Sequence, residues 1–230
     1  MQPLASACVA GEFFDGDFEI HVTVSCDDDG VMGLSSWASG AGLKLTHVVL
    51  ARGRVCSQPM LTLAGSGSLP EQLSAASGLA LKLGVDGFAV TRVKVEAAPW
   101  TRGVPRSDAQ ARALGPEFYF EHHVKLICDP DPGFGPAGFE SLVALVAPHR
   151  AHVSWNARRV RSDGRAERFV TQRCFGVGDD SAAAALADLS AALVADGHEI
   201  ASVEREFVVY DSDASLDAGW IDELADGGLR

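Results

Sequence analysis

Apolar and polar residues alternate along two segments of the chain, residues 18–27 and 120–129, and the two segments share much of their sequence. Phe, Glu, His, Val, Cys and Asp coincide in the same order, and such alternation is typical of a β-strand with one buried face. Further matches follow in the same order, at Thr46-His47-Val48 with Ala151-His152-Val153 and at Asp86-Gly87 with Asp196-Gly197. This ordered series of matches predicts an internal duplication of one structural unit.

Each copy is predicted to contain four strands and two helices. The strands are expected at residues 18–25, 43–51, 59–64 and 88–96 in the first copy and at 119–127, 150–156, 167–174 and 199–210 in the second. A short helix should follow the first strand, most clearly at residues 139–146, and a longer helix should precede the last strand. Ser68 and Glu71 form a capping-box pattern at the start of that longer helix, and Gly87 and Gly197 are expected stops. The order β-α-β-β-α-β predicts an α+β fold of two ferredoxin-like units with antiparallel sheets.

These elements divide the chain into four parts. We expect a first ferredoxin-like repeat over residues 1–98, a Pro- and Arg-containing linker over 99–116, and a second repeat over 117–212. An acidic tail, residues 213–230, completes the sequence, and its Trp220-Ile221 pair is expected to pack against the body.

Strand alternation separates the charged side chains from the apolar ones. With the apolar residues of the first strand directed toward the helices, Glu19 and His21 should point to the helix-free face of the sheet. The same alternation places Glu121, His123 and Lys125 on that face in the second copy. The last strands are expected to add charged residues to it, among them Arg92, Lys94, Glu96, Glu204 and Glu206. Two such faces opposite each other would form a polar cleft between the lobes.

Histidine beside glutamate suggests two kinds of chemistry. Imidazole and carboxylate together bind zinc, iron or manganese, and they also serve as general acids and bases. Glu19, His21, Glu121 and His123 are therefore candidate catalytic residues together with Lys125, and His21 and His123 are candidate metal ligands. His47 and His152, on neighbouring strands, are the remaining candidate metal ligands. The alternative is that the repeated histidines are structural and form hydrogen bonds between strands.

Two short resemblances point to phosphate chemistry. His21-Val22-Thr23 and His152-Val153-Ser154 look like the paired His-x-Thr/Ser motifs of the 2H phosphoesterase superfamily, which implies a two-lobed enzyme with both histidines in a central cleft. Separately, Glu121-x-His123-x-Lys125 resembles the Glu-x-Glu-x-Lys strand of triphosphate tunnel enzymes, with His123 in place of the middle carboxylate. Either resemblance implies a phosphorylated substrate.

Charge limits the possible partners. The formal net charge of −12 argues against a nucleic-acid backbone as partner, because phosphate binding needs clustered Lys and Arg. An arginine-rich stretch at residues 150–173 is the exception, and from it Arg158, Arg161 and Arg173 are candidate anion-binding residues. The alternative for this stretch is a solvated hairpin.

Cysteine spacing and hydropathy indicate the environment of the protein. The five cysteines lack CxxC spacing, which fits reduced thiols in the cytoplasm better than a disulfide framework. The first residues lack the basic region and apolar run of a signal peptide, and no stretch approaches the length of a membrane span. We therefore expect a cytoplasmic protein that does not bind membranes, and the pattern indicates no oligomeric state.

Together these observations predict a small enzyme of phosphoesterase or hydrolase type with a polar cleft between its lobes. Histidine and glutamate would act there on a phosphorylated or other anionic small molecule, with a divalent metal as the candidate cofactor. The alternative is a non-catalytic module that binds a ligand or a protein through its helix-free sheet faces.

Overall fold

The computed structural model describes residues 14–128, 136–158 and 161–221. The first half of the chain contains, in order, strand β1, helix α2, strands β2 and β3, helix α3 and strand β4. Their bounds are β1 Asp15–Ser25, α2 Asp28–Ala41, β2 Lys44–Leu50, β3 Ser57–Ser68, α3 Leu69–Val85 and β4 Ala89–Ala97. The predicted strands are therefore present, within a few residues of their expected bounds.

The second half has the same order of strands and helices, and its first helix is the shorter of the two corresponding ones, with 11 residues against 14. Its elements are β5 Tyr119–Cys128, α5 Pro136–Val146, η1 Ala147–His149, β6 Ala151–Asn156, β7 Ala166–Phe175, α6 Asp179–Ala195 and β8 Glu199–Asp211. A helix, α4 (Asp108–Leu114), lies between the halves, and the 3-10 helix η2 (Ala214–Asp217) follows β8. The protein is thus a mixed α+β fold with antiparallel strands, as the sequence predicts.

Local signals set the helix ends. The Ser68–Glu71 capping box is formed at the start of α3 as expected. The helix after β1 is longer than the short one predicted, because Asp27 caps it by accepting the Gly30 N–H at 2.9 Å. It ends at Gly42, whose φ of 68° is the left-handed conformation that glycine adopts readily.

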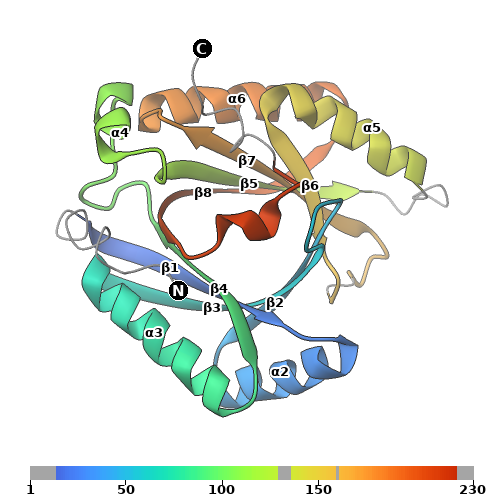
Figure 1. Cartoon of the computed structure of the whole chain (residues 1–230). Coiled ribbons are helices and arrows are strands. Elements are labelled where there is room, and N and C mark those ends of the chain that lie inside the picture. The colour runs from blue at the N-terminus through green and yellow to red at the C-terminus, as the bar shows by residue number, and fades with distance from the viewer. Residues whose placement is uncertain (1–13, 129–135, 159–160, 222–230) are drawn as a thin grey trace.

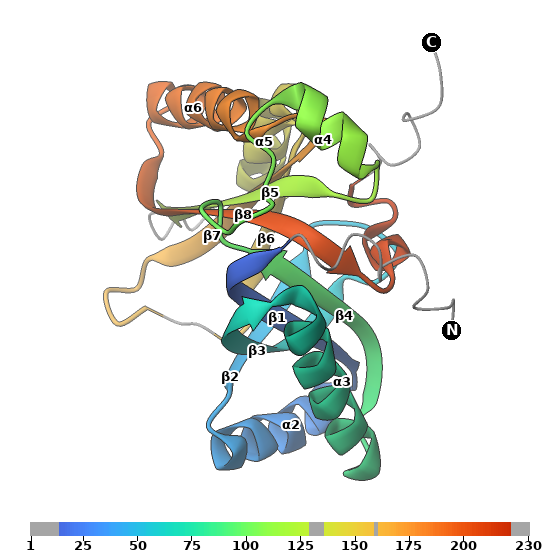
Figure 2. The same ribbon diagram turned by 90° about the vertical axis from the view of Figure 1, so that its left-hand side faces the viewer.

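The eight strands close into one barrel in the order β1-β3-β2-β6-β7-β5-β8-β4. Within each half the first strand pairs with the third and fourth, so β1 lies between β3 and β4 and β5 lies between β7 and β8. Two seams join the halves: β2 pairs with β6, and β4 pairs with β8. Helices α2 and α3 cover the outside of one half, and α5 and α6 cover the other (Figures 1 and 2). The helix-free faces therefore line the inside of the barrel.

Two hydrophobic cores lie between the strands and the helices, and the first one extends to Phe120 and Phe207 of the second half. Val22, Val24 and Leu83 belong to the first core, with Leu73 and Val93 partly buried against it. The second core contains the predicted residues Val124, Leu126, Leu189 and Leu193.

Val203 was expected in the second core and is not there; 42% of it is exposed. The β4–β8 seam begins only at Phe207, so the first part of β8 pairs with β5 alone. Val203 therefore borders an open groove between the lobes.

The segment after β8 packs against the barrel. Trp220 and Ile221 are buried with Leu50, as the sequence suggested. The division into two repeats, a linker and a tail stays a prediction, and residues 222–230 of the tail lie outside the described residues. None of the helices in the described ranges combines the length and the apolar character needed to cross a membrane.

Candidate functional site

Charged side chains fill the inside of the barrel. Glu19 and His21 from β1 and Glu121, His123 and Lys125 from β5 line one cavity of about 190 Å³. Arg173 from β7 lines the same cavity. Strand alternation thus brings the predicted catalytic residues of both lobes to one cavity.

His21 and His123 occupy corresponding positions in the two lobes. His21 pairs across the strands with Thr62, and its Nδ1 lies 3.1 Å from the threonine Oγ1. His123 pairs with Thr171 in the same way, with an Nδ1–Oγ1 distance of 3.0 Å. In both lobes this contact fixes the ring and leaves Nε2 directed toward carboxylates.

The carboxylates around each Nε2 come from the first and last strands. His21 Nε2 lies 2.7 Å from Glu96 Oε2 and 3.7 Å from Glu19 Oε2. His123 Nε2 lies 3.3 Å from Glu121 Oε1 and 3.5 Å from Glu206 Oε2. Burial opposes the charged imidazole of His123, but its hydrogen bonds to Glu121 and Glu206 outweigh burial and raise its pKa to about 10. His123 is therefore a cation at neutral pH.

A buried ion-pair network connects the two lobes. Lys94 Nζ lies 2.5 Å from Glu96 Oε1 and 2.5 Å from Glu121 Oε1. Arg173 in turn donates from Nε to Glu121. Burial would raise the pKa of Glu121, but Arg173 and Lys94 hold it well below its ordinary value. Glu121 thus stays ionised, with a partner on either side.

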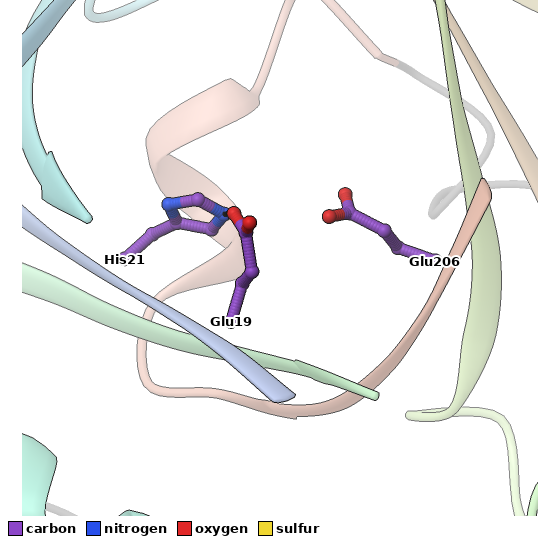
Figure 3. A group of neighbouring side chains, drawn as sticks. All are labelled: Glu19, His21 and Glu206. Atoms are coloured by element: carbon purple, nitrogen blue, oxygen red, sulfur yellow. Dashed lines mark ion pairs between the residues drawn. The ribbon is translucent and has the colours of Figure 1, made fainter. Parts of the chain in front are cut away.

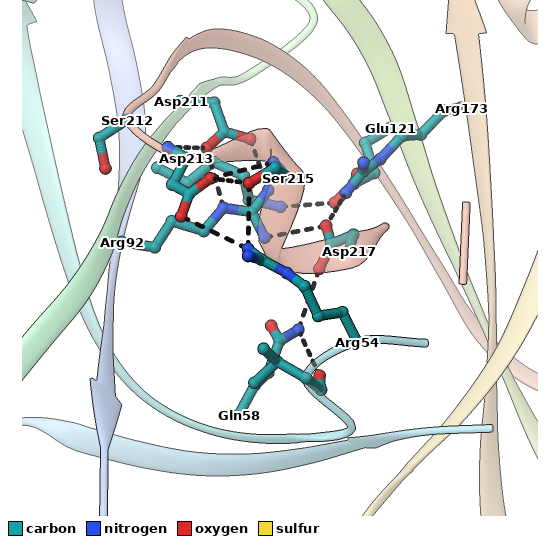
Figure 4. A network of polar contacts seen from close by, with 12 residues as sticks. Arg54, Gln58, Arg92, Glu121, Arg173, Asp211, Ser212, Asp213, Ser215 and Asp217 are labelled. Atoms are coloured by element: carbon teal, nitrogen blue, oxygen red, sulfur yellow. Dashed lines mark hydrogen bonds and ion pairs between the residues drawn. The ribbon is translucent and has the colours of Figure 1, made fainter. Parts of the chain in front are cut away.

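The segment after β8 extends this network at one end of the barrel. Asp217 in η2 accepts hydrogen bonds from Arg92 Nη1 at 2.9 Å, Arg173 Nη2 at 2.7 Å and Gln58 Nε2 at 3.0 Å (Figure 4). Arg92 also pairs with Asp211 at the end of β8. Figures 1 and 2 together place η2 over this end of the barrel. We call residues 211–221 the closing segment.

Two predicted metal ligands lie elsewhere. His47 does not line the cavity; its Nε2 lies 2.8 Å from Ser57 Oγ, and burial lowers its pKa. His152 does not line it either and packs against the Trp220 ring, with centroids 5.7 Å apart. The structure therefore does not gather the four candidate histidines into one ligand set, because His47 is on the opposite face of β2 from the cavity-lining Thr46.

The three candidate arginines are separated as well. Arg158 donates to Ser35 Oγ at 3.2 Å, and Arg161 pairs with Asp163 at 2.7 Å and Glu167 at 3.4 Å. Of the three, Arg173 alone lines the cavity, and it is nearly fully buried rather than at a rim.

Several residues of this site were absent from the candidates drawn from the sequence. Lys94, Glu96 and Glu206 were expected on the helix-free face. The β1–β4 pairing places Lys94 and Glu96 opposite His21 and Glu19, and the β5–β8 pairing places Glu206 opposite Glu121. Asp217 had no sequence signal, since it lies in a short acidic segment without a repeat counterpart.

Two groups of potential metal ligands lie among these side chains. Glu19, His21 and Glu206 each offer one ligand atom, and these atoms lie within 4.8 Å of one another (Figure 3). Glu96, His123 and Glu206 form a second such group.

A wide groove of about 910 Å³ adjoins the cavity. Glu19, Lys44, Glu204 and Glu206 line both spaces, so the groove leads to the cavity. Trp100 on its wall is 70% exposed and donates from Nε1 to Asp17 at 3.0 Å.

The comparisons with known proteins leave the family open. No family model and no curated protein sequence matches the chain. Among solved structures, the chain is similar to the small subunit of acetolactate synthase from Thermotoga maritima, with 12% identity over 85% of this chain and 95% of the other and a TM-score of 0.29. A putative chlorite dismutase gives 8% identity over 84% and 95%, with a TM-score of 0.28. Chlorite dismutase from Candidatus Nitrospira defluvii, in complex with imidazole, gives 12% over 84% and 91%, with a TM-score of 0.27. At these TM-scores the similarities carry no function to this chain.

Proposed function

We propose that this chain is a small enzyme of hydrolase type that binds a phosphorylated or other anionic small molecule inside its barrel. One observation supports it most: His21 and His123, both beside carboxylates, line the same cavity as Lys125. Acid–base groups and a cation around one enclosed space are the arrangement expected of such a site.

Lys125 is the side chain best suited to receive the anion. Its Nζ lies 3.9 Å from Glu167 and 5.5 Å from the centre of the Phe169 ring, so its ion pair is long. Lys94 and Arg173, by contrast, are each held close between two carboxylates. An anionic group entering the cavity would meet Lys125 and the charged ring of His123 on the same strand.

The size of the cavity limits the ligand. A space of about 190 Å³ is smaller than the ~300–1,000 Å³ of most small-molecule pockets. It suits one small anionic group, and the remainder of a larger ligand would lie in the adjoining groove.

His21 is the candidate acid–base residue. Its ring is fixed by Thr62, and its Nε2 can exchange a proton with Glu96 at 2.7 Å. His123 is charged by Glu121 and Glu206 and would instead stabilise negative charge on the ligand.

Binding and turnover test the proposal separately. In the presence of EDTA, calorimetry should show that the chain binds at least one of three anions: inorganic phosphate, pyrophosphate or adenosine triphosphate. Lys125→Met should weaken that binding about tenfold or more. Lys82→Met is the matched control, because Lys82 lies outside the barrel over the Trp37 ring. His21→Gln should still bind the anion but should no longer release phosphate from pyrophosphate or adenosine triphosphate. Absence of binding to all three anions, or equal binding by Lys125→Met, would refute the proposal.

A non-catalytic binding module is the second candidate. The internal pairing of His21 with Glu96 and of His123 with Glu121 favours it, since both rings are already occupied. Ligand binding that depends on Lys125 without any turnover would select this alternative.

We also propose that the two lobes arose by duplication of one β-α-β-β-α-β unit, with the boundaries predicted from the sequence. The matching His21–Thr62 and His123–Thr171 contacts support this origin, because the same residue types meet at the same positions of β1–β3 and β5–β7.

A further inference from the structure

We infer that Glu19, His21 and Glu206 form a binding site for a divalent transition metal, where the cavity meets the groove. The inference rests on the proposed function and changes one role in it: a metal on His21 Nε2 would replace the acid–base proton there and would bind an anionic ligand together with Lys125. It also selects, among the histidines considered above, the one whose carboxylate partners Glu19 and Glu206 border the open groove.

The three ligand atoms come from both lobes. Glu19 and His21 are two residues apart on β1 and therefore point to the same side of the strand. Glu206 points toward them from β8 (Figure 3). Zinc-like ions hold nitrogen and oxygen at about 2.0–2.2 Å, which puts tetrahedral ligand atoms roughly 3.5 Å apart. His21 Nε2 and Glu19 Oε2 are already 3.7 Å apart, and all three ligand atoms lie within 4.8 Å of each other.

The histidine is oriented as a metal ligand is. Metal-binding histidines commonly use one ring nitrogen for the metal and the other for a hydrogen bond that fixes the ring. Thr62 holds His21 Nδ1 at 3.1 Å, so Nε2 is the atom that faces the carboxylates. Glu96 Oε2 also lies 2.7 Å from Nε2, so three carboxylates surround this nitrogen. A metal ion would satisfy the several carboxylates that a single proton cannot.

The second ligand group shares this histidine orientation but is less open to an ion. Glu96 has no exposed side-chain surface, and Lys94 already lies 2.5 Å from it. His123 is held by Glu121, and a metal there would have to displace the Lys94 ammonium from its two carboxylates. In the first group, 48% of the Glu19 side chain is exposed, and both Glu19 and Glu206 border the open groove. An ion therefore has an entry path to the first group.

The donor set indicates which ions fit. Two carboxylates with one imidazole suit manganese, iron or zinc, whereas magnesium and calcium prefer oxygen ligands alone. Three protein ligands leave coordination positions for water or for an anionic ligand.

Metal titration of the EDTA-stripped, desalted chain tests the site. Calorimetry with Mn²⁺ or Zn²⁺, without any anion, should show one site per chain. His21→Gln, Glu19→Gln and Glu206→Gln should each weaken it about tenfold or more. Glu204→Gln is the matched control, since Glu204 borders the same cavity and groove without belonging to the ligand group, and it should bind like the wild type.

Glu19→Gln is the decisive variant, because its half-exposed side chain is the least important of the three for folding. Unchanged metal affinity in folded Glu19→Gln, or no binding by the wild type, would overturn the inference. If the chain binds an anion in EDTA but binds neither Mn²⁺ nor Zn²⁺, only the metal site is overturned and the proposed function stands. Metal binding without binding of phosphate, pyrophosphate or adenosine triphosphate would leave the metal site standing and refute the proposed function.

Discussion

Replacing Asp217 by Asn should destabilise the whole barrel, because this one carboxylate in the closing segment neutralises two buried arginines. Asp217 is 2% exposed and accepts from both Arg92 and Arg173. Its other oxygen accepts from Gln58. The Asn side chain is neutral and has one acceptor in place of two, so it cannot replace these contacts.

The size of the expected loss in the free energy of unfolding depends on the ion pairs that the two arginines retain. Removing one partner of a buried ion pair costs about 3–5 kcal/mol. Arg92 retains Asp211 and Arg173 retains Glu121, so the lower end of the range, about 3 kcal/mol, is expected. For a chain of this length, each kcal/mol changes the melting temperature by roughly 2–4 °C, which gives a decrease of about 6–12 °C.

Thermal unfolding followed by circular dichroism measures this decrease. Asp15→Asn is the control, because it removes the same charge from an exposed pair with Arg102 and should cost less than about 1 kcal/mol. An Asp217→Asn melting temperature within 2 °C of the wild type would show that the closing segment contributes little to stability.

Three further predictions concern the core, the cysteines and acid. Val124→Asp should lower the free energy of unfolding by more than about 4 kcal/mol, since Val124 is fully buried, whereas Val203→Asp should lower it by less than about 0.5 kcal/mol. Equal losses of the two variants in chemical denaturation would contradict the core assignment. Burial raises the pKa of Cys174 to about 11, so at pH 8 iodoacetamide should label the exposed Cys56 much faster than Cys174. Equal labelling rates of the two cysteines, measured by mass spectrometry, would count against the burial of Cys174. Burial opposes ionisation of Asp217, but Arg173 and Arg92 lower its pKa below the ordinary 3.8. The stability that ionised Asp217 contributes is therefore complete above pH 3.8 and is lost as the pH falls further. If Asp217→Asn unfolded in acid at the same pH as the wild type, Asp217 would not contribute to the acid sensitivity.

The sequence predicted most of the fold because its signals are local. Strand alternation placed Glu19 and His21 on the same face, and the similar residues in the second half of the chain led to Glu121 and His123. Caps and glycines located the helix ends, such as the capping box at Ser68.

The rest depended on contacts between distant segments. Closure of the barrel uses short pairings such as Val48–Leu50 with Ser154–Asn156, which no periodicity marks. Because the β4–β8 seam begins only at Phe207, Val203 lies beside the groove instead of in the core. Spacing alone could not show that Arg158 lies against α2 while Arg173 lies inside the barrel, because the two belong to a stretch of uniform composition.

The order in which the ribosome makes these segments has a consequence for folding. Arg92 in β4 is made before Asp211 and Asp217, its two partners in the finished barrel, and Lys94, which has Glu96 beside it, is made before its second partner Glu121. A nascent first lobe therefore carries a hydrated, charged inner surface, and charge of this kind discourages pairing with the strands of other chains. Because β8 forms part of the closed barrel, the barrel can close only after β8 and the closing segment have been made.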